Sequence, residues 1–156
     1  LRYRVRSGSN FVHDIEFVNR LVHDAAFRVH DIRGTKRHLE VPMTRIRWER
    51  RDEVARQQVT KTASALQFRG VSSVRWVSGN IRFTGGFEGH LFDESDTAAD
   101  QSACEIYRVF VAESTYSISS SPVEVVLTGY PSFWQLRIVL LPSRWSIELT
   151  DQPLIS

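Results

Sequence analysis

The chain lacks several features that would assign it to a protein class at once. It has one cysteine, Cys104, which excludes a framework of intramolecular disulfide bonds. No apolar run exceeds four residues, far short of the roughly 20 that cross a bilayer, so no membrane partner is expected. The first residues lack the apolar stretch of a secretory signal, which makes a cytoplasmic location the default. Because the sequence starts at leucine, the pattern leaves open whether a targeting segment was removed.

Catalytic and cofactor-binding motifs are also lacking. The sequence contains no nucleophile elbow, no phosphate-binding loop with its lysine, and no acidic loop with the ligand spacing of an EF-hand. It therefore predicts no cofactor and argues against an enzyme. At 156 residues and 42% hydrophobic composition, the chain is long enough to bury one sizeable core and too short for two.

Charge is distributed unevenly along the chain. Residues 1–82 carry 17 basic and 8 acidic side chains, whereas residues 83–156 carry 3 basic and 10 acidic ones. This asymmetry has two interpretations: an anionic partner for the first half, or attraction between the two halves of one folded chain. Only two of the 20 basic residues are lysines. The excess of arginine suits recognition of phosphate or carboxylate, but nucleotide bias in the genome produces it equally well.

From residue 60 onward the dominant pattern has a period of two, which is typical of strands with one buried face. The segments with this pattern are 60–68, 74–77, 81–84, 104–112, 123–127, 133–141 and 144–150. Glycine-containing turns separate the first three segments, which predicts a meander. The fourth segment is apolar on both faces and is expected to be a central strand. The last three read as consecutive antiparallel strands.

Residues 11–33 allow two interpretations, helix or strands. Apolar residues recur at the three-and-four spacing of a helix, with Asn10 available as an N-cap and Gly34 as a C-terminal cap. The composition argues against a helix, because strong helix formers are scarce in this window. Further along, residues 52–58 predict the start of a short helix.

If residues 26–32 form a strand, they pair with the alternating segment that follows, and burial selects the register. A five-residue loop places Phe27 opposite Met43 and apolar residues opposite one another, so we prefer this register. Pro42 then predicts an edge strand or a bulge. A change of phase after Met43 favours a bulge near Thr44.

These segments together predict an all-β fold that is mostly antiparallel. The expected architecture is a β-sandwich or partly open barrel of about 8–10 strands. At most one or two short helices are expected, in the first 60 residues. We interpret residues 1–156 as a single β domain.

Three His-Asp dipeptides mark the candidate metal ligands His13, His23 and His30. Metal-dependent phosphohydrolases use such dipeptides because carboxylate and imidazole groups together hold a divalent ion that activates water. Geometry weakens the case. Neighbouring residues of a strand point to opposite faces, and on a helix His23 and His30 would lie two turns apart.

The preferred hairpin register assembles a second candidate site from His30, His38, Glu40 and Arg28. It sets His30 opposite Glu40, with His38 diagonal to His30 and Arg28 on the same face. A carboxylate beside an imidazole suits a general base or an anion contact. A solvated cross-strand charge pair is the alternative, and it is favoured because no nucleophile or second acid is tied to the cluster.

Basic and aromatic residues are neighbours at many positions, such as Arg75 and Trp76, as in proteins that bind single-stranded nucleic acids. Alternation explains these pairs without a ligand, since an aromatic that faces the core places its strand neighbour in solvent. A phosphate-contacting patch remains as an alternative at four arginines, Arg45, Arg47, Arg50 and Arg51.

The function that these observations predict is a non-enzymatic binding or assembly module that uses a face or an edge of its sheet. The expected partner is another protein or a second copy, with the basic half of one chain against the acidic half of the other. The alternatives are nucleic-acid binding through the four arginines and metal-assisted hydrolysis of a phosphate ester by the His and Asp residues.

Overall fold

A computed structural model describes residues 1–8, 11–78, 81–85, 89–90, 104–112, 122–130 and 133–152. Antiparallel strands dominate this part of the chain, which confirms the predicted fold class. The strands are β1 (Arg2–Arg6), β2 (Ala26–Phe27), β3 (Arg33–Thr35), β4 (His38–Ile46), β5 (Lys61–Arg69), β6 (Val71–Ser78), β7 (Ile81–Gly85), β8 (Gly89–His90), β9 (Cys104–Val111), β10 (Val123–Tyr130), β11 (Trp134–Leu140) and β12 (Ser146–Asp151). The helices are α1 (Phe11–Val22), α2 (Arg51–Ala55) and a 3₁₀ turn, η1 (Val29–Asp31). No described helix is both long and apolar enough to cross a bilayer.

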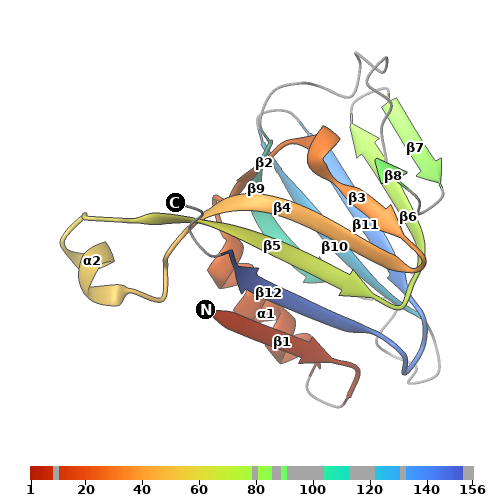
Figure 1. Ribbon diagram of the computed structural model, residues 1–156, viewed down its shortest axis with the longest axis horizontal. Coiled ribbons are helices and arrows are strands. Elements are labelled where there is room, and N and C mark those ends of the chain that lie inside the picture. Colours follow the sequence, from red (N-terminus) through yellow and green to blue (C-terminus); the bar gives the residue numbers. More distant parts are fainter. Residues whose placement is uncertain are drawn as a thin grey trace.

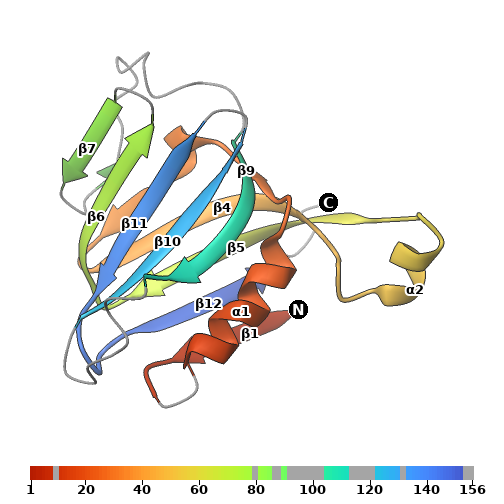
Figure 2. The ribbon, with the colours of Figure 1, turned by 180° about the vertical axis from the view of Figure 1, so that it is seen from behind.

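The strands form one partly open sheet whose two halves face each other (Figure 1). Its order is β1-β12-β5-β4-β2-β9-β10-β11-β6-β7, with β3 beside β4 and β8 beside β3. The short strand β2 joins the halves, because Ala26 pairs both with Thr44 of β4 and with Glu105 of β9. Away from this bridge β4 and β9 diverge, and the sheet opens between them (Figure 2).

The chain crosses from one half to the other at tight corners, which corrects two predicted arrangements. Strand β5 leads directly into β6 at Gly70, yet β5 pairs with β4 and β12 whereas β6 pairs with β11 and β7. Likewise, β12 follows β11 in the chain but pairs with β5 and β1. The predicted meander over residues 60–84 is therefore wrong at its first turn, although β6 and β7 pair as predicted. In the last third β10 and β11 pair as predicted, but β12 does not pair with β11. Gly70 has φ of +78°, and a Cβ atom there would lie 2.1 Å from the carbonyl oxygen of Arg144, so this corner requires glycine.

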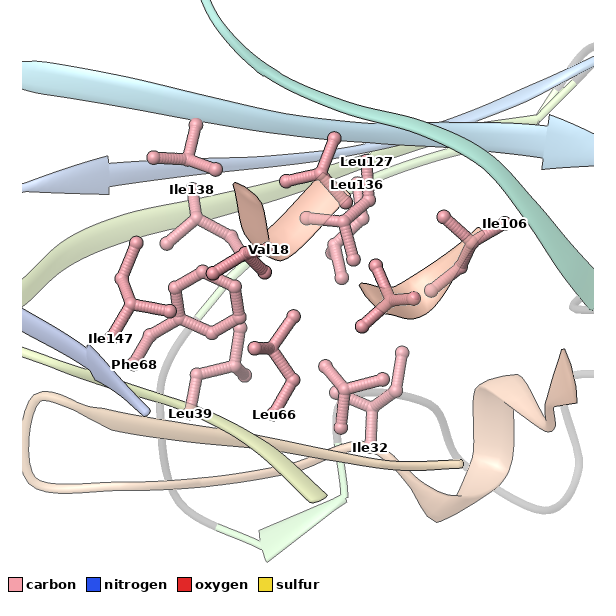
Figure 3. Close-up of a cluster of buried hydrophobic side chains, with 14 of the residues drawn as sticks. Val18, Ile32, Leu39, Leu66, Phe68, Ile106, Leu127, Leu136, Ile138 and Ile147 are labelled. Atoms are coloured by element: carbon pink, nitrogen blue, oxygen red, sulfur yellow. The ribbon is translucent and has the colours of Figure 1, made fainter. Parts of the chain in front are cut away.

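Alternating apolar side chains from both halves build one core. Strand β11 alternates strictly between buried and half-buried positions, and in β6 Trp76 is buried while its neighbour Arg75 is exposed. The predicted separation of aromatic and arginine neighbours is confirmed at this pair. Figure 3 shows core side chains that converge from both halves and from α1, among them Val18, Leu39, Leu66, Phe68, Ile106, Leu127, Leu136 and Ile147.

The helical interpretation is correct for residues 11–22, and short strands follow. Helix α1 packs on β9, β1 and β4 and covers the opening where the two halves diverge (Figure 2). Beyond it, Asp24 takes φ of 63° and donates its main-chain N–H to the carbonyl oxygen of Ile106 in β9. The residues that α1 buries are Ile15, Val18, Leu21 and Val22. Their burial outweighs the weak intrinsic helix preference of the segment.

The predicted hairpin register holds at one end only. Ala26 lies opposite Thr44, as the five-residue loop requires, but η1 then takes up three residues and shifts the register. Arg33 consequently lies opposite Glu40. The turn has two residues, Lys36 and Arg37, and both have positive φ, as a tight hairpin turn requires.

Pro42 lies in β4, at a point where one side of the strand is open. Pairing of β4 with β2 and β3 stops at Glu40 and resumes at Thr44, so a residue without an N–H group is tolerated between them. The predicted edge position of Pro42 is thus correct for this part of β4. The bulge predicted near Thr44 is wrong, because β4 pairs with β5 from His38 to Ile46 without a shift.

Candidate functional site

The three candidate metal ligands lie on different elements. His13 is exposed on α1, His23 lies just beyond its end, and His30 lies in η1. Within the described ranges, no group of three or more His, Cys, Asp or Glu side chains could hold a metal ion. The metal-ligand hypothesis gains no support from this geometry.

The second candidate site is not assembled as predicted from His30, His38, Glu40 and Arg28. The 3₁₀ turn removes His30 from the strand register, and Arg33 takes its place opposite Glu40. His38 pairs with Thr35 instead, and its Nε2 atom is buried without a hydrogen-bond partner in the described part of the chain. Arg28 is exposed beside a separate hollow formed by β2, η1 and β4.

Arg45 is fully buried, which contradicts its predicted place in an exposed phosphate-binding patch. Its guanidinium group donates to both carboxylate oxygens of Glu49, at 2.8 and 2.7 Å, and to both of Asp151, at 2.9 Å each. Its Nε atom lies 3.2 Å from Ser64 Oγ, which donates to Asp151 at 2.7 Å. Bidentate pairing with two carboxylates satisfies the arginine within the molecule, so it ties β4, β5 and β12 together and binds no external anion.

The acid sensitivity of the fold is expected to follow from Asp151. Burial raises the pKa of this carboxyl group, but hydrogen bonds from Arg45 and Ser64 outweigh burial and lower it from 3.8 to about 2. Since the folded pKa lies below the unfolded value, the ion pair stabilises the fold above the unfolded pKa, and this contribution disappears as the pH falls toward 2. After allowance for partial exposure, we expect a loss of about 1–2 kcal/mol over this window.

Urea denaturation at a series of pH values measures this contribution. The gap in unfolding free energy between the wild-type protein and Asp151→Asn should shrink as the pH falls through the window. A gap that stays constant down to about pH 2 would show that the carboxylate keeps an ordinary pKa in the folded state.

The other three arginines of the predicted patch lie in the projecting connection between β4 and β5, which carries α2 (Figure 1). Arg47 lies at its base, where its main-chain N–H donates to the carbonyl oxygen of Thr60. Arg47 is half-buried, while Arg50 and Arg51 are exposed. Arg50 pairs with Glu53 at 3.2 Å. The patch therefore loses Arg45, and one of the remaining cations is partly neutralised.

A register shift in β9 exposes two neighbouring side chains that sequence reasoning did not single out. On β10, Thr128 pairs with Arg108 but the next residue, Gly129, pairs with Ile106, so Tyr107 is an extra residue. Such a bulge bends a strand and re-aims its side chains, and bulges are frequent beside functional sites. Here Tyr107 and Arg108 are both exposed, although strict alternation would expose only one of them.

Tyr107 is the centre of a group of contacting rings that we call the aromatic cluster: His23, Trp48, Tyr107 and Tyr130. The Tyr107 and Tyr130 rings meet edge to face at 5.6 Å, and these side chains are 52% and 45% exposed. The His23 ring lies 5.9 Å from that of Tyr107 and 6.0 Å from that of Trp48. Trp48 Nε1 donates to the carbonyl oxygen of His23 at 2.7 Å, which holds the indole in place. Exposed aromatic rings fixed in this way are typical anchors of protein interfaces.

A groove between α1 and β9, which we call the α1–β9 groove, lies next to the aromatic cluster. Its volume is about 450 Å³, and a smaller hollow of about 220 Å³ adjoins it and shares Asn19 and Arg108 with it. The buried side chains of Ile15, Val109 and Val111 give it an apolar floor. Its charged lining residues are Glu16, Arg20 and Arg108.

Comparison with known proteins adds a partial match. Residues 9–84 match a family model described as protein of unknown function (DUF2948). Over these residues the chain resembles that family. The match includes the α1 wall of the groove and leaves out β9, which carries Tyr107 and Arg108. No curated protein and no solved structure matches the chain. The family description names no ligand or activity, so the geometry of the site carries the functional argument.

Proposed function

We propose that this domain is a non-enzymatic protein-binding module whose contact surface consists of the aromatic cluster and the α1–β9 groove. The observation that carries the proposal is the bulge in β9, which places an exposed tyrosine and an exposed arginine side by side at the groove. Tyrosine, tryptophan and arginine are the side chains that most often dominate binding energy at interfaces. An apolar floor beside them adds surface that a partner can bury.

The rings of the cluster are fixed before any partner arrives, which favours binding. His23 Nδ1 lies 3.0 Å from the carbonyl oxygen of Tyr107, so main chain and side chain connect the end of α1 to the bulge. Trp134 Nε1 donates to the carbonyl oxygen of Tyr130 at 2.9 Å and anchors the end of β10. A surface that is already ordered loses less conformational entropy on association.

A different protein is favoured over a second copy as the partner. Opposite charges in the two halves of the sequence meet inside the chain, where Arg2 pairs with Glu148 at 2.9 Å and Arg45 with Asp151. This internal pairing uses part of the complementarity on which self-association would depend. Sedimentation at low and high salt tests the alternative: a monomer that persists at both removes the salt-dependent dimer.

Replacing Tyr107 by serine is expected to weaken partner binding without unfolding the domain. An exposed side chain contributes little to stability, so the unfolding free energy should change by less than about 1 kcal/mol. An aromatic anchor of an interface typically contributes about 2 kcal/mol or more, which corresponds to roughly a 30-fold loss of affinity. The measurement is a titration with peptides selected on the wild-type domain from a displayed library of random peptides.

Val59→Ser is the matched control for this titration. Val59 is also an exposed apolar residue, and its side chain lines neither the α1–β9 groove nor the smaller hollow beside it. It should leave peptide affinity unchanged. If the Tyr107→Ser and Val59→Ser variants bound the peptides with equal affinity, Tyr107 would not belong to the contact surface. Failure of the wild-type domain to enrich any peptide, together with a salt-independent monomer, would contradict the binding function itself.

A further inference from the structure

The edge of strand β9 that faces β2 and α1 has two parts, one paired with another strand and one unpaired among the described residues. Near its start it is paired there, because Ala26 and Phe27 of β2 lie opposite Glu105 and Cys104. Ile106 continues this pairing with main-chain hydrogen bonds to the segment just before β2. From Tyr107 to Val111 no described strand lies on this side, and the groove takes its place. This free edge spans about 13 Å at the usual rise of a strand.

The hydrogen-bonding direction of the free edge follows from the pairing with β10. The N–H of Ala112 donates to the carbonyl oxygen of Glu124, which fixes Ala112 as a residue that bonds toward β10. Because direction alternates along an antiparallel strand, the N–H and C=O groups of Val109 and Val111 point toward the groove. The N–H of Val109 confirms this, since it donates to Asn19 Oδ1 of α1 at 2.7 Å.

Asn19 covers only part of this edge. Its side chain accepts from the N–H of Val109, whereas Val111 has no hydrogen-bond partner on the groove side among the described residues. Within the part of the chain that the structure describes, both main-chain groups of Val111 and the carbonyl of Val109 are therefore available to an added strand. Unpaired groups of this kind are the usual template for strand addition.

Charge indicates what kind of strand fits. Two guanidinium groups, from Arg20 and Arg108, and one carboxylate, from Glu16, line the groove. None of the three takes part in an ion pair within the described part of the chain. The guanidinium of Arg108 lies 4.5 Å from the centre of the Phe110 ring, which holds it at the groove. An incoming strand with acidic side chains would complement the two cations, and its alternate apolar side chains would meet the apolar floor.

Building on the proposed function, we infer that the partner binds as an extended acidic peptide segment that adds a strand to β9 in the α1–β9 groove. Main-chain bonds to Val109 and Val111 hold the segment in register. Arg20 and Arg108 select its acidic side chains, and the aromatic cluster covers one end.

The test uses the peptides selected on the wild-type domain, prepared with single N-methyl groups along the backbone. Strand addition predicts that N-methylation at alternate positions lowers affinity at least about tenfold, while the positions between them tolerate it. It also predicts that peptide binding slows hydrogen exchange of the Val111 amide at least about tenfold. The amide of Phe110, which points toward β10, is the internal control.

A charge exchange completes the test. The variant Arg20→Glu/Arg108→Glu should lose affinity for the acidic peptides and gain it for peptides whose acidic residues are replaced by lysine. Arg56→Glu, an exposed change near α2, should do neither. One outcome would overturn strand addition and leave the binding function intact. In that outcome the selected peptides need Tyr107, but they tolerate every N-methyl group and bind the wild-type domain and the Arg20→Glu/Arg108→Glu variant equally well. Absence of any selected peptide would overturn strand addition, and together with a salt-independent monomer it would overturn the binding function as well.

Discussion

Replacing Arg45 by methionine is expected to lower the free energy of unfolding by about 3 kcal/mol. The substitution keeps much of the side-chain volume, but it leaves the carboxylates of Glu49 and Asp151 without the cation that they share. Removing one partner of a buried ion pair typically costs about 3–5 kcal/mol, and the partial exposure of both carboxylates places this case at the lower end. In thermal denaturation the melting temperature should fall by roughly 6–12 °C.

Arg50→Met provides the matched control. Arg50 also pairs with a glutamate, but its side chain is half exposed, so its loss should cost less than about 1 kcal/mol. A second variant, Arg45→Met/Asp151→Asn, removes one unpaired charge and should recover part of the stability that Arg45→Met loses. If Arg45→Met cost no more than Arg50→Met, the buried network would contribute nothing to the fold.

The prediction that Arg45 lies in an exposed patch was wrong, although the pattern of β4 favours burial. Leu39, Val41, Met43 and Arg45 share the buried face of β4, so simple alternation places the arginine inside. A buried charge is costly without partners, and its partner Asp151 lies 106 residues away in the chain. The expectation of a bulge at Thr44 moved Arg45 to the surface. No local signal identifies such a distant carboxylate.

Local alternation predicted most strands but only some of their neighbours, such as the pairs β6–β7 and β10–β11. The segments around β5, β6, β10 and β11 lie where the period-two pattern placed them, because burial of one face is a property of each strand alone. Pairing depends on where the chain turns. Gly70 turns β5 into the opposite half of the sheet, although a glycine at that position suits a hairpin equally well.

The candidate site escaped prediction for a related reason. An aromatic cluster formed by the end of α1, β9 and β10 depends on contacts between distant segments. One signal was present: a glycine inside a strand often marks a bulge on its partner or a close approach of backbone. Gly129 is that glycine, but with the following Pro131 and Ser132 the same sequence also fits a turn.

Gly129→Ala is expected to destabilise the domain by about 3 kcal/mol and to weaken peptide binding as well. A Cβ atom at this position would lie 1.8 Å from the carbonyl oxygen of Glu105 and 2.9 Å from the ring of Trp134. The first contact is with main chain, so β9 itself must move. Because Gly129 pairs with Ile106 at the register shift, that movement displaces the bulge and with it Tyr107.

Gly8→Ala is the matched control. It tests whether the loss of stability and of peptide binding is specific to Gly129 or follows from any glycine-to-alanine change. Nothing lies within 4 Å of a Cβ atom at Gly8, so this change should alter stability by less than about 0.5 kcal/mol and leave binding intact. For Gly129→Ala, loss of peptide affinity at a temperature where the variant is still folded separates a displaced bulge from simple unfolding. A folded variant that keeps full affinity would show that the position of Tyr107 does not depend on the bulge, and the main argument for the binding surface would then fail.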